Sequence, residues 1–158
     1  MPPPLPKSAS ITVPKASTYV SGYGVVTTLT GEMRTNAKTI IAVGRELGAS
    51  KRALVIALAT AMQESGLKNI AYGDLDSVGL FQQRPSKGWG TVEQILKPEY
   101  AARAFFLGTG TENPGLFDIA GWSSMTVTKA AQSVQVSAFP NAYAQWQGSA
   151  EYWLAELS

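Results

Sequence analysis

The sequence predicts a mostly α-helical domain, in which helices surround a buried central helix and a small β-hairpin or loop lobe completes a cleft. Two observations predict this fold class. Residues 53–62 form a continuous apolar run, which is typical of a helix buried on every side. Over residues 67–90, glycines, aspartates and Pro85 break the helical periodicity, which indicates loops or a small hairpin. With 158 residues, the chain has room for one hydrophobic core.

The first 31 residues are predicted to form an extended arm, and residues 32–158 the folded domain. The arm is rich in Pro, Ser, Thr, Val and Gly, and short strands are expected at residues 11–13 and 19–29. It has no apolar stretch behind a basic start, so no secretory signal is expected in it.

Two helices are expected to follow the arm. Helical periodicity begins near Thr35, and Gly48 is expected to end that helix. Ser50 is a suitable cap for the second helix, which contains the apolar run, and Gly66 is expected to end it. Glu64 therefore stands at the C-terminal edge of the most apolar helix.

The later elements are shorter. Thr91 and Gln94 have the spacing of a capping box for a short helix, and Pro98 is a suitable first residue for the next one. The remaining predicted segments are helices over residues 99–107, 128–138 and 142–157, and a turn-rich connection over residues 108–115.

The composition excludes several kinds of chemistry. The chain has neither histidine nor cysteine, so nucleophiles activated by histidine, HExxH zinc peptidases and thiolate metal sites are excluded. No metal and no cofactor are expected, and acid–base chemistry falls to lysines and the eleven carboxylates. The net charge is only +2 and the Lys and Arg residues are scattered along the chain, which disfavours nucleic acid as a partner. No apolar stretch is long enough to span a bilayer.

Glu64 is the strongest candidate for a catalytic acid. A carboxyl group that follows a long apolar run loses solvation, and the negative end of the helix dipole disfavours its ionised form further. Both effects predict a raised pKa, and a carboxylic acid that stays protonated can donate a proton to a leaving oxygen. The alternative is an ordinary surface glutamate at a helix end.

A motif begins at Glu64 and favours the catalytic interpretation. Glu64-Ser65 is followed by Ser77-Val78-Gly79-Leu80-Phe81-Gln82-Gln83-Arg84-Pro85. This pattern resembles the E-S … S/A-x-G-L-M-Q-x-x-P signature of the lytic transglycosylase family, which includes the goose-type lysozymes. Residues 61–67, 72–90 and 128–146 are similar to a transglycosylase-like subgroup of bacterial cell-wall proteins and phage lysins. The resemblance covers residues 35–153 and implies a lysozyme-like α+β fold.

The resemblance implies an enzyme that cleaves the β-1,4 bond between MurNAc and GlcNAc in peptidoglycan, with Glu64 as general acid and base. Gly79 and Gln82 match the part of the motif that lines the substrate cleft, where a glutamine amide can bind an N-acetyl group. Ser65 either supports the site or orients the helix end. The other candidates for substrate binding are Ser77, Gln83, Trp89, Gln135 and Tyr143. Gln135 lies where broader relatives have a Tyr-Asn pair, so its role depends on the subgroup.

Asp74 and Asp76 are the other catalytic candidates. Either one is placed to hold a water as a general base or to stabilise positive charge on the sugar, and both are equally well explained as turn residues. Goose-type lysozymes have an aspartate shortly after the motif, where this chain has Arg84. If neither aspartate assists, Glu64 acts alone and the product is a 1,6-anhydro sugar.

Aromatic side chains suit the C–H faces of sugars, and two are expected to be exposed. Trp89 lies between two glycines in a loop and is the first candidate, and Tyr143 is the second. Phe81 and Trp146 are expected in the core.

The expected partner is the glycan strand of peptidoglycan, bound by a monomer that acts on the bacterial cell wall, as an extracellular protein or as a phage lysin. The alternative function is a non-catalytic lysozyme-like module for peptidoglycan binding or assembly. The intact Glu64 argues against this alternative.

Overall fold

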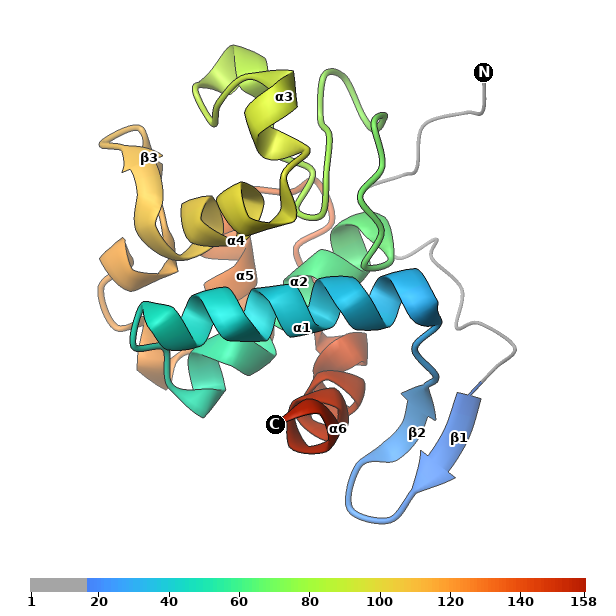
Figure 1. Ribbon diagram of the computed structural model, residues 1–158. Helices are drawn as coiled ribbons and strands as arrows, with labels where there is room; N and C mark the ends of the chain where they lie inside the picture. Colours follow the sequence, from blue (N-terminus) through green and yellow to red (C-terminus); the bar gives the residue numbers. More distant parts are fainter. Residues whose placement is uncertain (1–16) are drawn as a thin grey trace.

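The computed structural model describes residues 17–158, so the strand expected at residues 11–13 lies outside the described part. The described part is mostly helical, with helices packed around α2 (Lys51–Ser65), as the sequence predicts (Figure 1). The other elements, in chain order, are β1 (Ser17–Val20), β2 (Gly24–Thr27), α1 (Gly31–Glu46), η1 (Pro85–Lys87), α3 (Val92–Ile95), α4 (Pro98–Leu107), β3 (Gly108–Gly110), β4 (Asn113–Pro114), η2 (Leu116–Asp118), η3 (Trp122–Ser124), α5 (Val127–Gln135), η4 (Tyr143–Trp146) and α6 (Gln147–Leu157).

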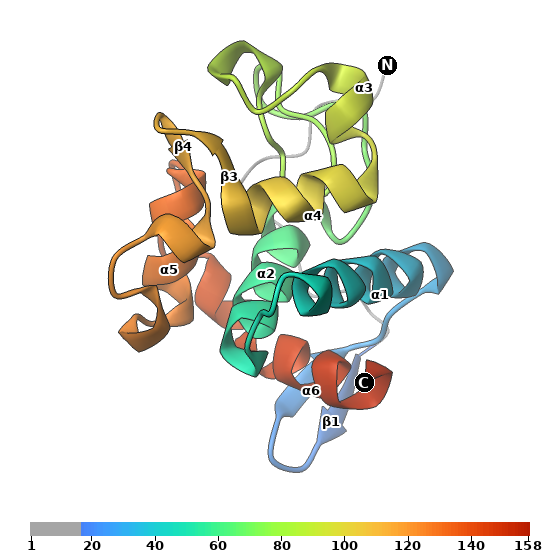
Figure 2. The ribbon, with the colours of Figure 1, turned by 60° about the vertical axis from the view of Figure 1, so that its left-hand side comes forward.

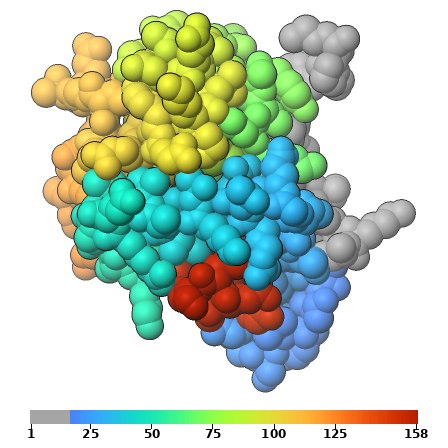
Figure 3. Space-filling view, viewed as in Figure 1, coloured from blue at the N-terminus to red at the C-terminus, as the bar shows by residue number. Residues whose placement is uncertain are grey.

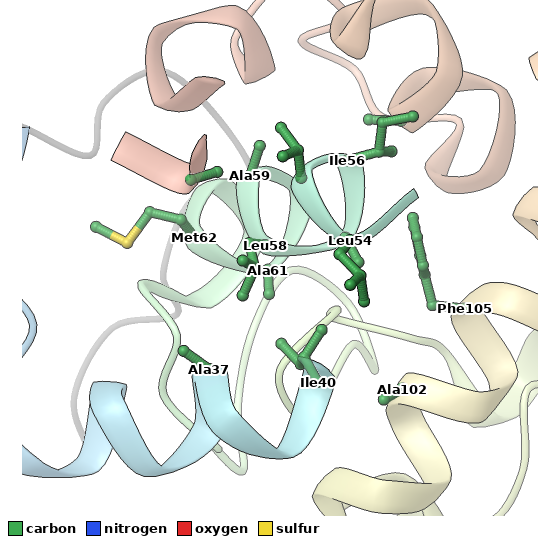
Figure 4. Packing of buried hydrophobic residues seen from close by; sticks show 14 of the residues in the cluster. Ala37, Ile40, Leu54, Ile56, Leu58, Ala59, Ala61, Met62, Ala102 and Phe105 are labelled. Atoms are coloured by element: carbon green, nitrogen blue, oxygen red, sulfur yellow. The ribbon is translucent and has the colours of Figure 1, made fainter. Parts of the chain in front are cut away.

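The central helix α2 is buried along almost its whole length. Ser50 caps it by accepting a hydrogen bond from the Ala53 amide at 3.2 Å, and Gly66 ends it in the left-handed conformation at φ 70°. Every residue from Ala53 to Ser65 is buried, because α1, α4, α5 and α6 all pack against this helix (Figure 2). In the core, Leu54 and Leu58 point toward small and apolar residues of α1 and α4 (Figure 4).

Helix α1 begins at Gly31, four residues before the apolar periodicity predicts. Thr30 occupies the extended N-cap position, and Glu32 stands in the first turn, where the helix dipole favours an acidic residue. These polar signals precede the apolar face and were therefore missed by periodicity alone. At Gly44 the helix approaches α2 closely, since a Cβ there would lie 2.4 Å from Cδ2 of Leu54.

Strands β1 and β2 form an antiparallel hairpin within the segment expected to be an arm. The hairpin packs on α6 through two buried hydrogen bonds. The Thr27 amide donates to Ser149 Oγ at 3.1 Å, and Trp153 Nε1 donates to the Thr27 carbonyl at 2.8 Å. Figure 3 shows α6 (red) packed between α1 and this hairpin. The described part of the arm is therefore attached to the helical body.

The segment between α2 and α3 is a loop with one antiparallel bridge, between Val78 and Gln83. The second hairpin, β3–β4, forms instead from the segment predicted as a turn-rich connection, and it lies beside α4 (Figure 2). The capping box of Thr91 and Gln94 is confirmed at the start of α3. Helix α5 ends at Gln135, earlier than predicted, because Val136 is left-handed. None of the helices within residues 17–158 is long and apolar enough to cross a bilayer.

Candidate active site

Glu64 lies in the last turn of α2 and is fully buried. Its Oε2 accepts two hydrogen bonds, from Tyr143 Oη at 2.8 Å and from Gln135 Nε2 at 2.9 Å. Gln135 Nε2 also donates to the Phe81 carbonyl at 2.7 Å, which fixes its amide group between the two acceptors. Helix α5, η4 and the loop before η1 therefore all converge on this carboxyl group.

Tyr143 remains a hydrogen-bond donor at any ordinary pH. Burial, the negative charge of Glu64 and the hydrogen bond to Glu64 hold the pKa of the Tyr143 phenol far above its usual value of 10, against a smaller opposing effect of a hydrogen bond with Ser137. The phenol therefore keeps its proton, and it has a negative partner to donate to when Glu64 is ionised.

A cleft of about 800 Å³ lies next to this carboxyl group. Its walls come from residues in three segments: 74–89, 112–114 and 133–139. Glu64 does not itself line the cleft, but Gln135 both lines it and bonds Glu64, so the carboxyl group lies behind the wall of the cleft. This arrangement places a buried acid beside a groove that can hold an extended ligand.

Three buried polar side chains form the floor of the cleft: Ser77, Gln82 and Gln83. In each, one oxygen has no hydrogen-bond partner among the described residues, namely Ser77 Oγ, Gln82 Oε1 and Gln83 Oε1. Buried polar atoms rarely stay unsatisfied, so these oxygens indicate a surface that bonds a polar ligand or water. We refer to these three residues as the cleft floor.

The Gln82 side chain is held in place at a conformational cost. Its backbone is left-handed, at φ 51°, and its Nε2 donates to the carbonyls of Tyr72 and Gly79. Gly73 makes room for it, because a Cβ at Gly73 would lie 1.7 Å from Gln82 Oε1. The reason for glycine at position 73 is thus steric, because any side chain there would collide with Gln82 of the cleft floor.

Of the residues expected to bind substrate, three lie outside the cleft lining, namely Ser65, Gly79 and Tyr143, and the first two do so for reasons of local structure. Ser65 Oγ lies within hydrogen-bond distance of the carbonyls of both Ala61 and Leu80, so it ties the end of α2 to the loop that carries the motif, residues 77–85, which we call the motif loop. Gly79 has φ 81° and packs on α3, where a Cβ would lie 2.9 Å from the Ile95 carbonyl oxygen. Both residues shape the loop that carries the cleft floor, and neither faces the groove.

The two aspartates are placed differently. Asp76 accepts hydrogen bonds from Arg84 Nε at 2.6 Å and from the Ser86 amide at 2.8 Å, and it does not line the cleft. The hydrogen bond from Arg84 holds the pKa of Asp76 well below its usual value, against a smaller opposing effect of burial. Asp74 is exposed and lines the cleft. Of the two, Asp74 alone faces the groove.

The aromatic residues agree with the sequence expectations except at Tyr143. Trp89 is half-buried and lines the cleft, and Phe81 and Trp146 are core residues. The expectation of an exposed Tyr143 is wrong, since its side chain is fully buried. Its hydroxyl reaches Glu64 because η4 folds back against α2, a long-range contact that local pattern does not reveal.

Sequence reasoning missed the residues at the edge of the cleft. Leu75, Val136 and Phe139 line it with exposed apolar side chains, and we refer to them as the cleft rim. The sequence held no signal for them, because their exposure is a property of the fold.

The β3–β4 hairpin was missed as a wall of the cleft. Asn113 Nδ2 donates to the Lys87 carbonyl at 2.7 Å, and Thr109 Oγ1 donates to the Gly88 carbonyl at 2.9 Å. These bonds fasten the hairpin to the loop after η1.

Comparison with models of known protein families and with curated protein sequences finds no match for this chain.

Proposed function

We propose that this chain is a peptidoglycan-cleaving enzyme with a lysozyme-like fold, which breaks the β-1,4 bond between MurNAc and GlcNAc with Glu64 as general acid and base. The observation that carries the proposal is the setting of Glu64: a fully buried carboxyl group at the end of an apolar helix, oriented by two donors, next to a large cleft. The motif from Glu64 to Pro85, which resembles the lytic transglycosylase signature, supports it independently.

The hydrogen bonds around Glu64 suit a group that changes charge. In the acid form, the carboxyl proton passes to the glycosidic oxygen as the bond to the sugar breaks. The carboxylate that remains is stabilised by Tyr143 and Gln135, which already donate to Oε2 and need no rearrangement. The same carboxylate then accepts a proton from the group that attacks the sugar.

The cleft floor suits a substrate that carries N-acetyl groups. The unsatisfied oxygens of Ser77, Gln82 and Gln83 are acceptors, and the N–H of an acetamide is a donor. Trp89 offers an aromatic face at the same groove for a pyranose ring. Both amino sugars of peptidoglycan carry the acetamide.

We propose the lytic transglycosylase reaction over hydrolysis. A hydrolytic mechanism needs a second carboxylate to hold the attacking water. Asp76 is engaged by Arg84 and Ser86 and does not line the cleft, and the Asp74 carboxylate, which does line it, has no hydrogen bond among the described residues to orient it for that task. With Glu64 acting alone, the C6 hydroxyl of the muramic residue attacks its own C1, the proton goes to Glu64, and a 1,6-anhydro end forms without water.

The direct test is the Glu64→Gln variant, assayed by the clearing of purified cell-wall suspensions. We expect a loss of activity of at least about 100-fold, because the amide has no proton to donate and general acid catalysis contributes on that order. The exposed Glu99→Gln serves as the matched control and should clear walls as the wild type does. Undiminished clearing by a folded Glu64→Gln variant would contradict the proposal, and inactive wild-type protein that still binds walls would favour the non-catalytic module.

A further inference from the structure

Backbone strain in this protein gathers at the cleft. Among the described residues, the non-glycine residues with positive φ are Leu67, Leu75, Gln82 and Val136. Three of the four line the cleft. Left-handed backbone is costly for residues with a Cβ, and such residues concentrate where function requires a particular side chain. For Gln82 the required side chain belongs to the cleft floor, and Leu75 and Val136 need a separate explanation.

Leu75 and Val136 each carry two unfavourable features at once. Leu75 has φ 56° and Val136 has φ 48°, a conformation in which a β-branched residue is a genuine outlier. Their side chains are also 73% and 79% exposed, so neither stabilises the fold by packing in the core. Asparagine or glycine would suit both the backbone and the solvent better.

The fold requires the left-handed backbone at both positions, but not the apolar side chains. Val136 terminates α5, with its amide donating to the Gln132 carbonyl at 2.8 Å. Leu75 lies in the turn that the Ser77 amide closes by bonding the Asp74 carbonyl at 3.0 Å. Gln135, which bonds Glu64, directly precedes Val136, and Ser77 of the cleft floor follows Leu75 by two residues. Both apolar side chains therefore stand next to groups of the site.

We propose that Leu75 and Val136 are substrate-contacting residues that hold the methyl groups of N-acetyl substituents on the glycan. This inference rests on the proposed function and adds a specificity determinant to it. An acetamide has a polar N–H and an apolar methyl group, and the cleft offers a partner for each. The oxygens of the floor accept from the N–H, and the aliphatic side chains of Leu75 and Val136 cover the methyl group and lose their own exposure to water.

The test compares Val136→Asn and Leu75→Asn with the wild type in three measurements. Asparagine tolerates left-handed backbone, so the midpoint of thermal unfolding should stay the same or rise. On peptidoglycan, KM should rise on the order of fivefold for each variant, as the loss of a partly buried aliphatic contact predicts, with kcat within about twofold. Val25→Asn, at an exposed valine of β2 outside the cleft, is the matched control and should leave KM unchanged.

The third measurement uses the same peptidoglycan after chemical N-deacetylation. The ratio of the variant KM to the wild-type KM should fall toward one, because the methyl groups are gone. An unchanged KM on intact peptidoglycan, a loss of unfolding midpoint that parallels the loss of activity, or an equal penalty on the deacetylated polymer would each overturn the inference.

Failure of the proposed function gives a different pattern. If wild-type protein binds peptidoglycan without cleaving it, the catalytic proposal falls alone, and the dissociation constants for intact and deacetylated peptidoglycan take the place of KM in the same comparison. Weaker binding by the two asparagine variants, confined to the acetylated polymer, then supports the inference, and equal binding by all variants overturns it.

Discussion

Tyr143 contributes to the site through one hydrogen bond, and its burial explains why this bond persists. The phenol is fully buried and its pKa is raised far above the usual range, so it keeps the proton that it donates to Glu64 Oε2. Since it touches Glu64 and lines no part of the cleft, Tyr143 acts as a positioning residue.

Tyr143→Phe should therefore lower kcat more than it raises KM. Removing a hydrogen bond to a charged group costs about 1.5–3 kcal/mol, which corresponds to a kcat reduced on the order of tenfold to a hundredfold. The alkaline limb of the pH–rate profile should also move to higher pH, because the ionised Glu64 has lost one of its two donors. Steady-state kinetics across pH measures both effects. Tyr152→Phe is the control, and a profile that stays in place would leave Tyr143 with a packing role.

Asp76 gives a prediction of stability as a function of pH. Its pKa is lowered in the folded protein from the usual 3.8, chiefly by the hydrogen bond from Arg84. A lowered pKa in the folded state stabilises the protein above the usual value, and that contribution disappears as pH falls through the folded value. Asp76→Asn should thus lower the free energy of unfolding at pH 7 by at most about 1 kcal/mol, since the pair is partly exposed.

The difference between wild type and Asp76→Asn should shrink steadily below about pH 4 and vanish in stronger acid. Urea unfolding at pH 7, 4 and 2.5 measures it, with Asp74→Asn as the reference for loss of a neighbouring charge. A difference that persists undiminished at pH 2.5 would show that Asp76 stabilises the loop by some means other than its charge.

At the scale of elements, the sequence predicted the features that depend on neighbouring residues. Ser50, Gly66 and the capping box at Thr91 act on neighbouring backbone groups, so their effects were readable from the sequence. The apolar run likewise predicted the burial of α2, and with it the position of Glu64. Tyr143 and the β3–β4 hairpin were misread, because their places depend on contacts between distant segments.

The motif loop illustrates the same limit. The sequence indicated that Gly79 belongs to the site, but the reason lies in α3, which packs against it. The sequence alone does not distinguish a glycine that leaves room for a ligand from a glycine that leaves room for a neighbouring helix. Ser65 is similar, since its hydroxyl bonds the Leu80 carbonyl rather than facing the groove.

Gly79→Ala and Gly48→Ala form a matched pair that isolates this contact. Both glycines have nearly the same φ, 81° and 80°, so both variants incur the cost of left-handed backbone, about 1–2 kcal/mol. A Cβ at Gly48 meets nothing within 4 Å, whereas at Gly79 it would lie 2.9 Å from the Ile95 carbonyl oxygen.

Gly79→Ala should therefore be the less stable variant, by about 1–3 kcal/mol. It alone should also impair wall clearing, because the backbone at position 79 must move away from α3, and this movement displaces the cleft floor. Chemical denaturation and the clearing assay measure the two effects. Equal stability of the two variants would rule out close packing on α3 as the reason for glycine at position 79.

At the scale of the whole molecule, the N-terminal hairpin of β1 and β2 packs on α6 and covers part of the core. Val26 and Thr27 are buried, and Trp153 of α6 depends on the Thr27 carbonyl for its indole hydrogen bond. The hairpin does not line the cleft. Its contribution is thus to the stability of the helical body.

Removing residues 1–28 should lower the free energy of unfolding by about 3 kcal/mol or more relative to removal of residues 1–16. The estimate combines the lost burial of Val26 with an indole N–H left without its acceptor. Thermal and urea unfolding of the two truncated proteins measure it. Equal stability would mean that the hairpin lies on the body without stabilising it.

The central claim is that Glu64, acting alone, releases an anhydro sugar from the glycan. Mass spectrometry of peptidoglycan digested by the wild type and by Glu64→Gln tests it most directly. The account predicts muropeptides that end in 1,6-anhydro-MurNAc, 18 mass units lighter than hydrolytic products by the loss of one water, from the wild type alone. The same anhydro products from Glu64→Gln, at the wild-type rate, would contradict it.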